Sequence, residues 1–96
     1  MGELRLHPAA RTATWNDQQV QLSGREFKVL YALATRYGRA FSSTELLGTV
    51  WTDKPDPRTN SVQFSVCRLR RKLHAIGAPH LVHTRHGHGY QLHVPD

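Results

Sequence analysis

The sequence predicts an α+β fold in which short strands come first, three helices follow and a β-hairpin closes the chain. Short stretches near the start alternate polar and apolar residues, as strands with one buried face do. Two Ser-x-x-Glu motifs each precede an apolar run with helical spacing, and two glycines separate the last strand-like stretches. The 96 residues and the apolar fraction of 39% suit one modest core, so we expect a single domain over 1–96.

The first three strands are predicted at 3–7, 11–15 and 18–22. Asn16 and Asp17 between the last two strands are typical of a tight turn. A small antiparallel sheet is therefore expected at the N-terminus.

Two capping boxes place the first two helices. Ser23 and Glu26 can exchange hydrogen bonds with each other's backbone N–H groups, which predicts a helix over 24–37. Ser42 and Glu45 repeat the pattern and predict a short helix over 43–51. Two prolines and two aspartates then predict a loop at residues 52–57.

A third helix follows this loop, with Thr59 or Asn60 as its cap and Gly77 at its end. Its apolar residues step by four, three, four and three, which aligns them in one narrow stripe. These residues are Val62, Val66, Leu69, Leu73 and Ile76. The last two strands are predicted at 81–84 and 90–94.

The side of the third helix opposite the stripe carries no acidic residue, and it consists of Asn60, Phe64, Cys67, Arg68 and Arg71. Arginine can form paired hydrogen bonds to guanine or a contact to phosphate, and asparagine suits adenine. Phe64 would lose its contact with water if it met a thymine methyl group in the major groove. The alternatives are that Phe64 packs under the hairpin or that the helix is rotated from this estimate.

Positive charge is concentrated in the last two-fifths of the chain. Residues 1–57 hold seven Lys and Arg against six Asp and Glu, whereas residues 58–96 hold six against one. Six of the seven histidines also lie in residues 58–96. This distribution favours a polyanionic partner such as nucleic acid.

The chain resembles the DNA-binding half of OmpR/PhoB-type response regulators from about residue 4 to 94. The resemblance rests on four segments in the same order: residues 22–30 opening a helix, residues 46–51 on a short helix, residues 58–73 leading into the third helix, and residues 87–92 near the end. It implies a winged helix-turn-helix fold with a four-stranded N-terminal sheet. It also implies that the third helix enters the major groove of double-stranded DNA and that the hairpin wing meets the minor groove.

The resemblance and the residue pattern together give the predicted DNA-binding set. On the third helix, Arg70, Arg71 and Lys72 are expected to bind the DNA backbone, and the other side chains of the set are expected to contact bases. The full set is Asn60, Ser61, Phe64, Ser65, Arg68, Arg70, Arg71 and Lys72 on the helix, with Thr84, Arg85, His86 and Gly87 on the wing. The resemblance further implies that RNA polymerase is contacted through residues 52–57 and that two copies bind tandem half-sites as a dimer.

Three departures from the family pattern limit this transfer. Residues 62–66 read Val-Gln-Phe-Ser-Val, so no base preference can be borrowed. His86 stands where the family has an arginine in the wing, and Arg85 precedes it. The receiver domain that precedes this half in the family is not among these residues.

Other functions have weaker support in the sequence. No catalytic constellation or glycine-rich phosphate loop is recognisable, so neither an enzyme nor a cofactor is expected. Histidines at 80, 83, 86, 88 and 93 invite a metal site, but the segment offers no Cys or carboxylate partner, so no metal is expected. A winged helix that binds only proteins remains the alternative function.

The lone Cys67 and the lack of a membrane-spanning run favour a cytoplasmic protein. Cys67 itself is interpreted as an ordinary small residue rather than a redox reporter.

Overall fold

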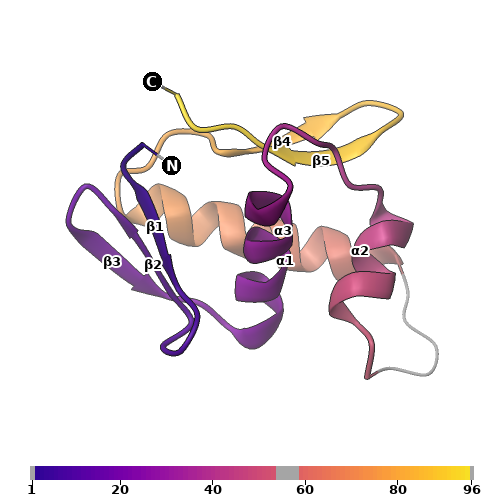
Figure 1. Cartoon of the computed structure of the whole chain (residues 1–96), viewed down its shortest axis with the longest axis horizontal. Helices are drawn as coiled ribbons and strands as arrows, with labels where there is room; N and C mark the ends of the chain where they lie inside the picture. Colours follow the sequence, from indigo (N-terminus) through magenta and orange to yellow (C-terminus); the bar gives the residue numbers. More distant parts are fainter. Residues whose placement is uncertain (1, 54–58, 96) are drawn as a thin grey trace.

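A computed structural model describes residues 2–53 and 59–95 and has the element order that the sequence predicts. A three-stranded sheet lies at one end of three helices, and a hairpin covers their upper side (Figure 1). The two chain ends lie near each other on the same side of the molecule (Figure 1). The elements are β1 (Leu4–His7), β2 (Thr12–Trp15), β3 (Gln18–Gln21), α1 (Gly24–Thr35), α2 (Ser43–Val50), α3 (Thr59–Ala75), β4 (Val82–Arg85) and β5 (Gly89–Leu92).

The N-terminal sheet pairs β1 with β2 and β2 with β3, both antiparallel. Asn16 and Asp17 adopt φ values of 47° and 72°, which confirms the tight turn between β2 and β3. The resemblance implied four strands, but the described part of this sheet has three. The chain enters α1 directly after β3, because the capping residue Ser23 comes two residues after that strand ends.

Both predicted capping boxes are present at the starts of α1 and α2. The backbone N–H of Ser23 donates to Glu26 Oε1 over 2.8 Å, and that of Ser42 donates to Glu45 Oε1 over 3.0 Å. α1 ends at Thr35, two residues earlier than predicted. Tyr37 therefore lies just beyond α1. Its hydroxyl accepts a hydrogen bond from the backbone N–H of Val94 at 2.7 Å, which connects the segment after α1 to the C-terminal segment.

The apolar stripe of α3 forms the centre of the core. Val62, Val66, Leu69 and Leu73 are each at most 2% exposed, as predicted. Ile76 lies beyond the end of α3 and packs against the core from the following turn. α3 already includes both expected capping residues, Thr59 and Asn60, and position 58 before it is outside the described residues.

The hairpin β4–β5 sits against the segment between α1 and α2. Phe41 and Tyr90 exchange backbone hydrogen bonds of 2.7 and 2.8 Å. A Cβ atom at Gly89 would lie 1.9 Å from the Phe41 carbonyl oxygen, so only glycine permits this approach. Gly87, with φ of 78°, makes the turn at the tip. The hairpin is therefore held in a fixed place beside the helices.

Candidate nucleic-acid interface

One side of α3 faces solvent along most of its length. Asn60, Cys67, Arg68 and Arg71 are all exposed, and Phe64 is 61% exposed. This confirms the orientation predicted from spacing. The alternative that Phe64 packs under the hairpin is wrong, because a phenyl ring in that position would be shielded from solvent.

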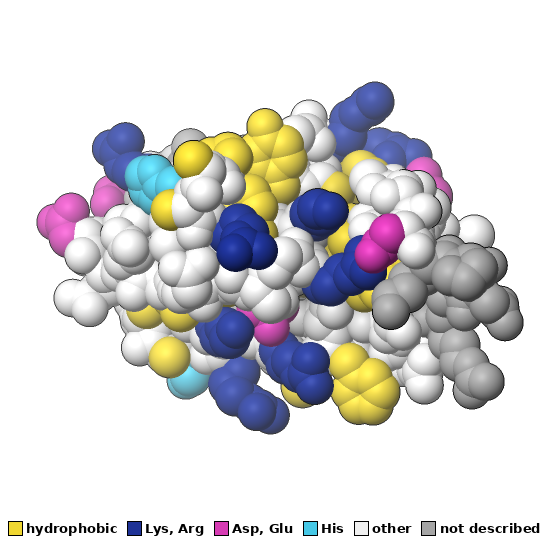
Figure 2. Space-filling view, turned by 90° about the horizontal axis from the view of Figure 1, so that it is seen from below, with side chains coloured by type: hydrophobic (Ala, Val, Ile, Leu, Met, Phe, Trp, Pro, Cys, Tyr) yellow, Lys and Arg dark blue, Asp and Glu magenta, His cyan; other side chains and the backbone are white. Residues whose placement is uncertain are grey.

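The exposed side of α3 is free of negative charge, since residues 59–75 include no Asp or Glu. The two neighbouring carboxylates among the described residues are both paired with cations. Glu26 accepts from Lys72, and Asp53 accepts from Arg25, each at 2.7 Å. Lys and Arg side chains gather along the middle and lower edge of the molecular face in Figure 2. This electrostatic character suits a polyanion.

A shallow hollow of about 310 Å³ adjoins the exposed side of α3. Ser61, Phe64 and Arg68 form its α3 wall, while Arg25 and Trp51 close it from the other side. Arg25 is held in place by donating to the carbonyl of Val50 at 2.6 Å. Sequence reasoning missed Arg25, because it lies inside a capping box on α1 and nothing in that motif indicates a place beside α3.

The two serines that line this hollow differ in burial. Ser61 is half-buried, whereas Ser65 is only 7% exposed. Ser65 lies two positions before Cys67 and directly before the buried Val66, so the helix turns it toward the core. Its predicted role as a base contact is not supported by this burial.

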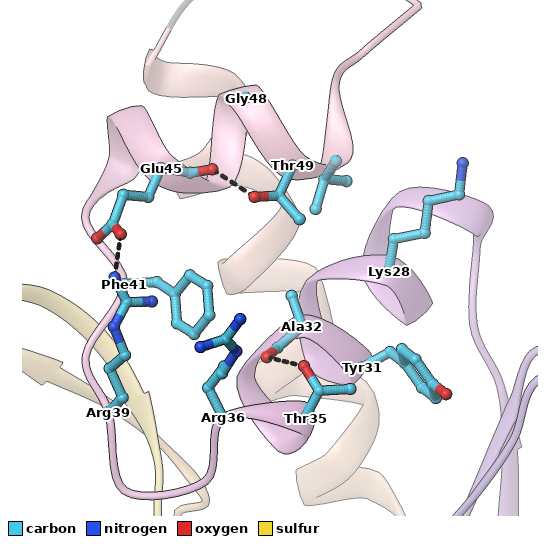
Figure 3. A pocket seen from close by; sticks show the side chains of 11 residues that line it. Lys28, Tyr31, Ala32, Thr35, Arg36, Arg39, Phe41, Glu45, Gly48 and Thr49 are labelled. Atoms are coloured by element: carbon cyan, nitrogen blue, oxygen red, sulfur yellow. Dashed lines mark hydrogen bonds and ion pairs between the residues drawn. The ribbon is translucent and has the colours of Figure 1, made fainter.

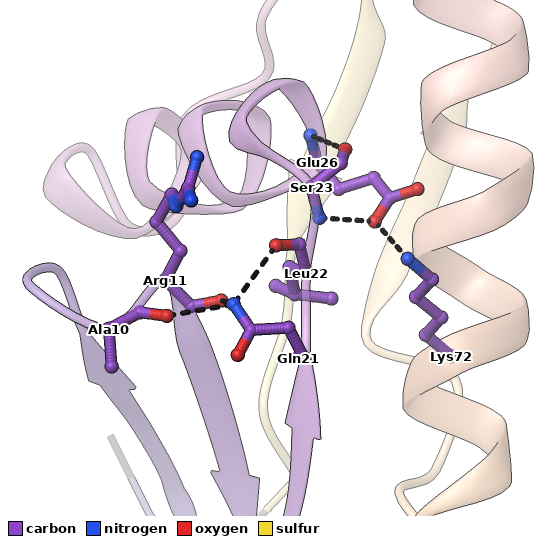
Figure 4. Close-up of polar contacts among 7 residues, drawn as sticks. All are labelled: Ala10, Arg11, Gln21, Leu22, Ser23, Glu26 and Lys72. Carbon is purple, nitrogen blue, oxygen red and sulfur yellow. Dashed lines mark hydrogen bonds and ion pairs between the residues drawn. The ribbon is translucent and has the colours of Figure 1, made fainter.

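Lys72 points away from the exposed side of α3 and binds the start of α1 (Figure 4). Its ammonium donates to Glu26 Oε1 at 2.7 Å, and the Glu26 side chain is 4% exposed. Burial raises the pKa of Glu26, but hydrogen bonds from Lys72 and Ser23 outweigh it and leave the pKa below its usual 4.5. Lys72 therefore forms a structural ion pair that joins α1 to α3, and its phosphate contact stays a prediction.

Arg70 connects α3 to the hairpin. Its Nε donates to the Val82 carbonyl at 2.9 Å, and its NH2 group donates to the Thr84 hydroxyl at 2.7 Å. The guanidinium also lies over the ring of Tyr90, 5.7 Å from the ring centroid. These three contacts position the wing relative to α3, and the contact of Arg70 with DNA stays a prediction.

The predicted wing residues lie at the exposed end of the hairpin. Thr84, Arg85, His86 and Gly87 are all exposed. Nε of Arg85 donates to Gln91 Oε1 on the facing strand at 3.1 Å, which directs the guanidinium along the hairpin. The wing thus presents one arginine, held by a neighbour, beside the glycine turn.

Three of the histidines in residues 80–93 are in ring contact. His83 stacks edge-on against His80 and His93, with ring centroids 4.6 and 5.7 Å apart. Burial lowers the pKa of His83, and positive neighbours lower it further. Within residues 2–53 and 59–95 no three His, Cys, Asp or Glu side chains are placed to share a metal ion.

The remaining predictions have mixed outcomes. Trp51 is 6% exposed and Tyr90 is half-buried against the core, so both are structural as expected. Cys67 is exposed on α3. Most of the loop predicted at 52–57 lies outside the described residues. No helix in the described ranges has the length and apolar character needed to cross a bilayer.

An N-terminal sheet, three helices and a hairpin fixed beside the third helix define a winged helix-turn-helix domain. The DNA-binding domain of CadC from E. coli has the same arrangement, with a TM-score of 0.85 and 28% identity over 98% of this chain and 89% of that one. The family described as "Transcriptional regulatory protein, C terminal" matches residues 17–92. The chain therefore belongs to this family, the OmpR/PhoB-type effector domains of response regulators.

Two curated relatives are longer proteins. Protein RcaC of Microchaete diplosiphon is 39% identical over 95 residues, which cover 98% of this chain and 15% of RcaC. Transcriptional regulatory protein CutR of Streptomyces coelicolor is 37% identical over 89 residues, which cover 93% of this chain and 40% of CutR. The chain thus spans less than half the length of either relative.

Proposed function

We propose that this protein binds double-stranded DNA sequence-specifically and regulates transcription as the effector domain of a response regulator. The observation that carries the proposal is the exposed side of α3, which presents Asn60, Phe64, Arg68 and Arg71 without a carboxylate. The major groove of B-form DNA is about 12 Å wide and an α-helix with side chains is about 10–12 Å across, so α3 fits it.

Each exposed group has a separate role in this proposal. Arg68, at the hollow beside Phe64, pairs with a guanine edge, and Asn60 reads an adenine. Arg71 lies further along the same side of α3 and binds phosphate. On the wing, Arg85 and His86 contact the neighbouring minor groove and its backbone.

Family membership supports the proposal, since a CadC domain with this fold is described as DNA-binding and CutR is described as a transcriptional regulatory protein. Two copies on tandem half-sites are part of the proposal, because one α3 reads only a few base pairs. Contact with RNA polymerase through residues 52–57 rests on the family resemblance alone. A function on the chromosome places the protein in the cytoplasm.

Selection from a random pool of duplex DNA tests the proposal directly. We expect enrichment of one short motif, repeated at a fixed spacing if two copies bind. Arg68→Ala should weaken binding to that motif by about 1–3 kcal/mol and relax the preference at one base pair. Arg5→Ala on β1, an exposed arginine far along the chain from α3, should leave binding unchanged. Recovery of no motif would favour the protein-binding alternative.

A further inference from the structure

An open groove of about 710 Å³ runs between α1 and α2. Figure 3 shows Ala32 and Thr35 of α1 facing Gly48 and Thr49 of α2 across it. Phe41 and Val50, which are 6% and 1% exposed, form an apolar floor that the protein itself already covers. Tyr31 stands at one end with 45% of its surface exposed, so the groove offers an exposed aromatic side chain for apolar contact.

Positive charge surrounds this apolar floor. Lys28 on α1, Arg36 at its end and Arg39 on the following segment line the groove, against the single carboxylate of Glu45. Arg39 already pairs with Glu45 and lies over the Phe41 ring, 4.6 Å from its centroid. Among the described residues, Lys28 and Arg36 have no carboxylate partner. Two cations at the rim therefore remain available for a ligand.

We infer that this groove binds an acidic segment of a partner protein that inserts an aromatic or aliphatic side chain. Carboxylates of the segment would pair with Lys28 and Arg36 while the inserted side chain packs against the exposed ring of Tyr31. A DNA duplex suits the groove less well, because the Tyr31 ring has no apolar partner on a phosphate backbone. A protein segment satisfies both the charge and the apolar surface.

Such binding goes beyond the proposed DNA contact and is compatible with it. The hollow beside α3 is lined by Arg25, Trp51, Ser61, Phe64, Ser65 and Arg68. None of these residues lines the groove between α1 and α2. A partner seated in the groove therefore leaves the exposed side of α3 uncovered, and one protein can hold DNA and a partner segment together.

A displayed library of random 12-residue peptides, selected against the whole protein, tests the inference. We expect the enriched peptides to combine Asp or Glu with a large apolar residue. The double variant Lys28→Glu, Arg36→Glu should weaken the best peptide by about tenfold or more, because both exposed cations become repulsive. Arg5→Glu, which reverses an exposed charge elsewhere, should bind the peptide normally.

Gly48 supplies a matched pair of variants for the apolar floor. A Cβ atom at Gly48 meets nothing within 4 Å, so a larger side chain enters the groove without clashing with the protein. Gly48→Phe should block the peptide, whereas Gly48→Ala should retain it. Enrichment of basic or purely polar peptides would overturn the inference. So would a peptide whose affinity survives both Gly48→Phe and the double charge reversal, or a double reversal that weakens duplex binding as strongly as Arg68→Ala does.

Discussion

At the scale of single residues, Phe64 is the clearest sign that α3 meets a ligand. A phenyl ring that is 61% exposed contributes little to the stability of the free protein. Two arginines line the hollow with it, Arg25 across from it and Arg68 on the same wall, and both are suited to DNA rather than to an apolar protein surface. The methyl group of thymine is the apolar group that the major groove offers.

Replacing thymine by uracil in the selected site tests this contact, because uracil lacks only that methyl group. One or two positions should lose about fourfold in affinity for the wild-type protein, which corresponds to about 0.8 kcal/mol for one buried methyl group. Phe64→Ala should bind the thymine and uracil duplexes equally. A Phe64→Ala variant that still distinguishes them would assign the methyl contact to another residue.

The ion pair between Lys72 and Glu26 contributes to the stability of the fold. Lys72→Ala leaves the buried Glu26 carboxylate with the hydrogen bond that it accepts from the backbone N–H of Ser23. We expect a loss of about 1–2 kcal/mol in the free energy of unfolding, discounted because the Lys72 side chain is 38% exposed. Urea unfolding measures it. In a Glu26→Gln background the same substitution should cost clearly less.

This pair also gives stability a pH dependence of known sign. Because folding lowers the pKa of Glu26, its contribution is complete above the unfolded value of 4.5 and is lost as the pH falls through the lower folded value. Urea unfolding at a series of pH values below 4.5 should show a shallower loss for Glu26→Gln than for the wild-type protein. Identical slopes would mean that other carboxylates control acid unfolding.

At the scale of elements, Arg70 makes the wing a partner of α3 instead of a free hairpin. Arg70→Ala removes its bonds to Val82 and Thr84. We expect faster hydrogen exchange in β4 and β5, and a loss of DNA affinity of about two- to tenfold on specific and random duplexes alike, since the wing must then be ordered on binding.

Arg70→Lys separates positioning from charge, because lysine keeps the charge but cannot form the two-pronged contact. It should exchange as fast as Arg70→Ala and bind DNA as weakly. Full DNA affinity together with a loosened wing would return Arg70 to the direct phosphate contact that its sequence position indicates.

The order of the elements and the starts of α1 and α2 were predictable, because capping boxes and the apolar stripe are local patterns. The contacts that the basic side chains of Arg70 and Lys72 make were not predictable. At about 100° per residue, Arg70 and Lys72 lie on the two flanks of the stripe, where helical spacing cannot distinguish solvent from a neighbouring element. Their partners lie 12 and 46 residues away in the sequence. Arg68 and Arg71 lie further from the stripe, and for them spacing was sufficient.

At the scale of the whole molecule, basic residues serve two separate surfaces. One includes Arg68 and Arg71 on α3, and the other includes Lys28 and Arg36 at the groove between α1 and α2. Net charge alone cannot tell these surfaces apart, because both attract anions. The release of counterions on DNA binding distinguishes the two surfaces, since only cations that neutralise DNA phosphates contribute to the salt dependence of DNA binding.

The salt dependence of DNA binding therefore tests this division. With about half a dozen phosphate contacts, the logarithm of the binding constant should fall with the logarithm of salt concentration with a slope of about −5. Arg71→Ala should reduce the steepness of that slope by about 0.9, which corresponds to one phosphate contact. Lys28→Ala should leave it unchanged, because Lys28 faces the groove between α1 and α2. Fluorescence anisotropy titrations at a series of salt concentrations measure all three slopes. Equal reductions in the two variants would mean that DNA wraps across both surfaces.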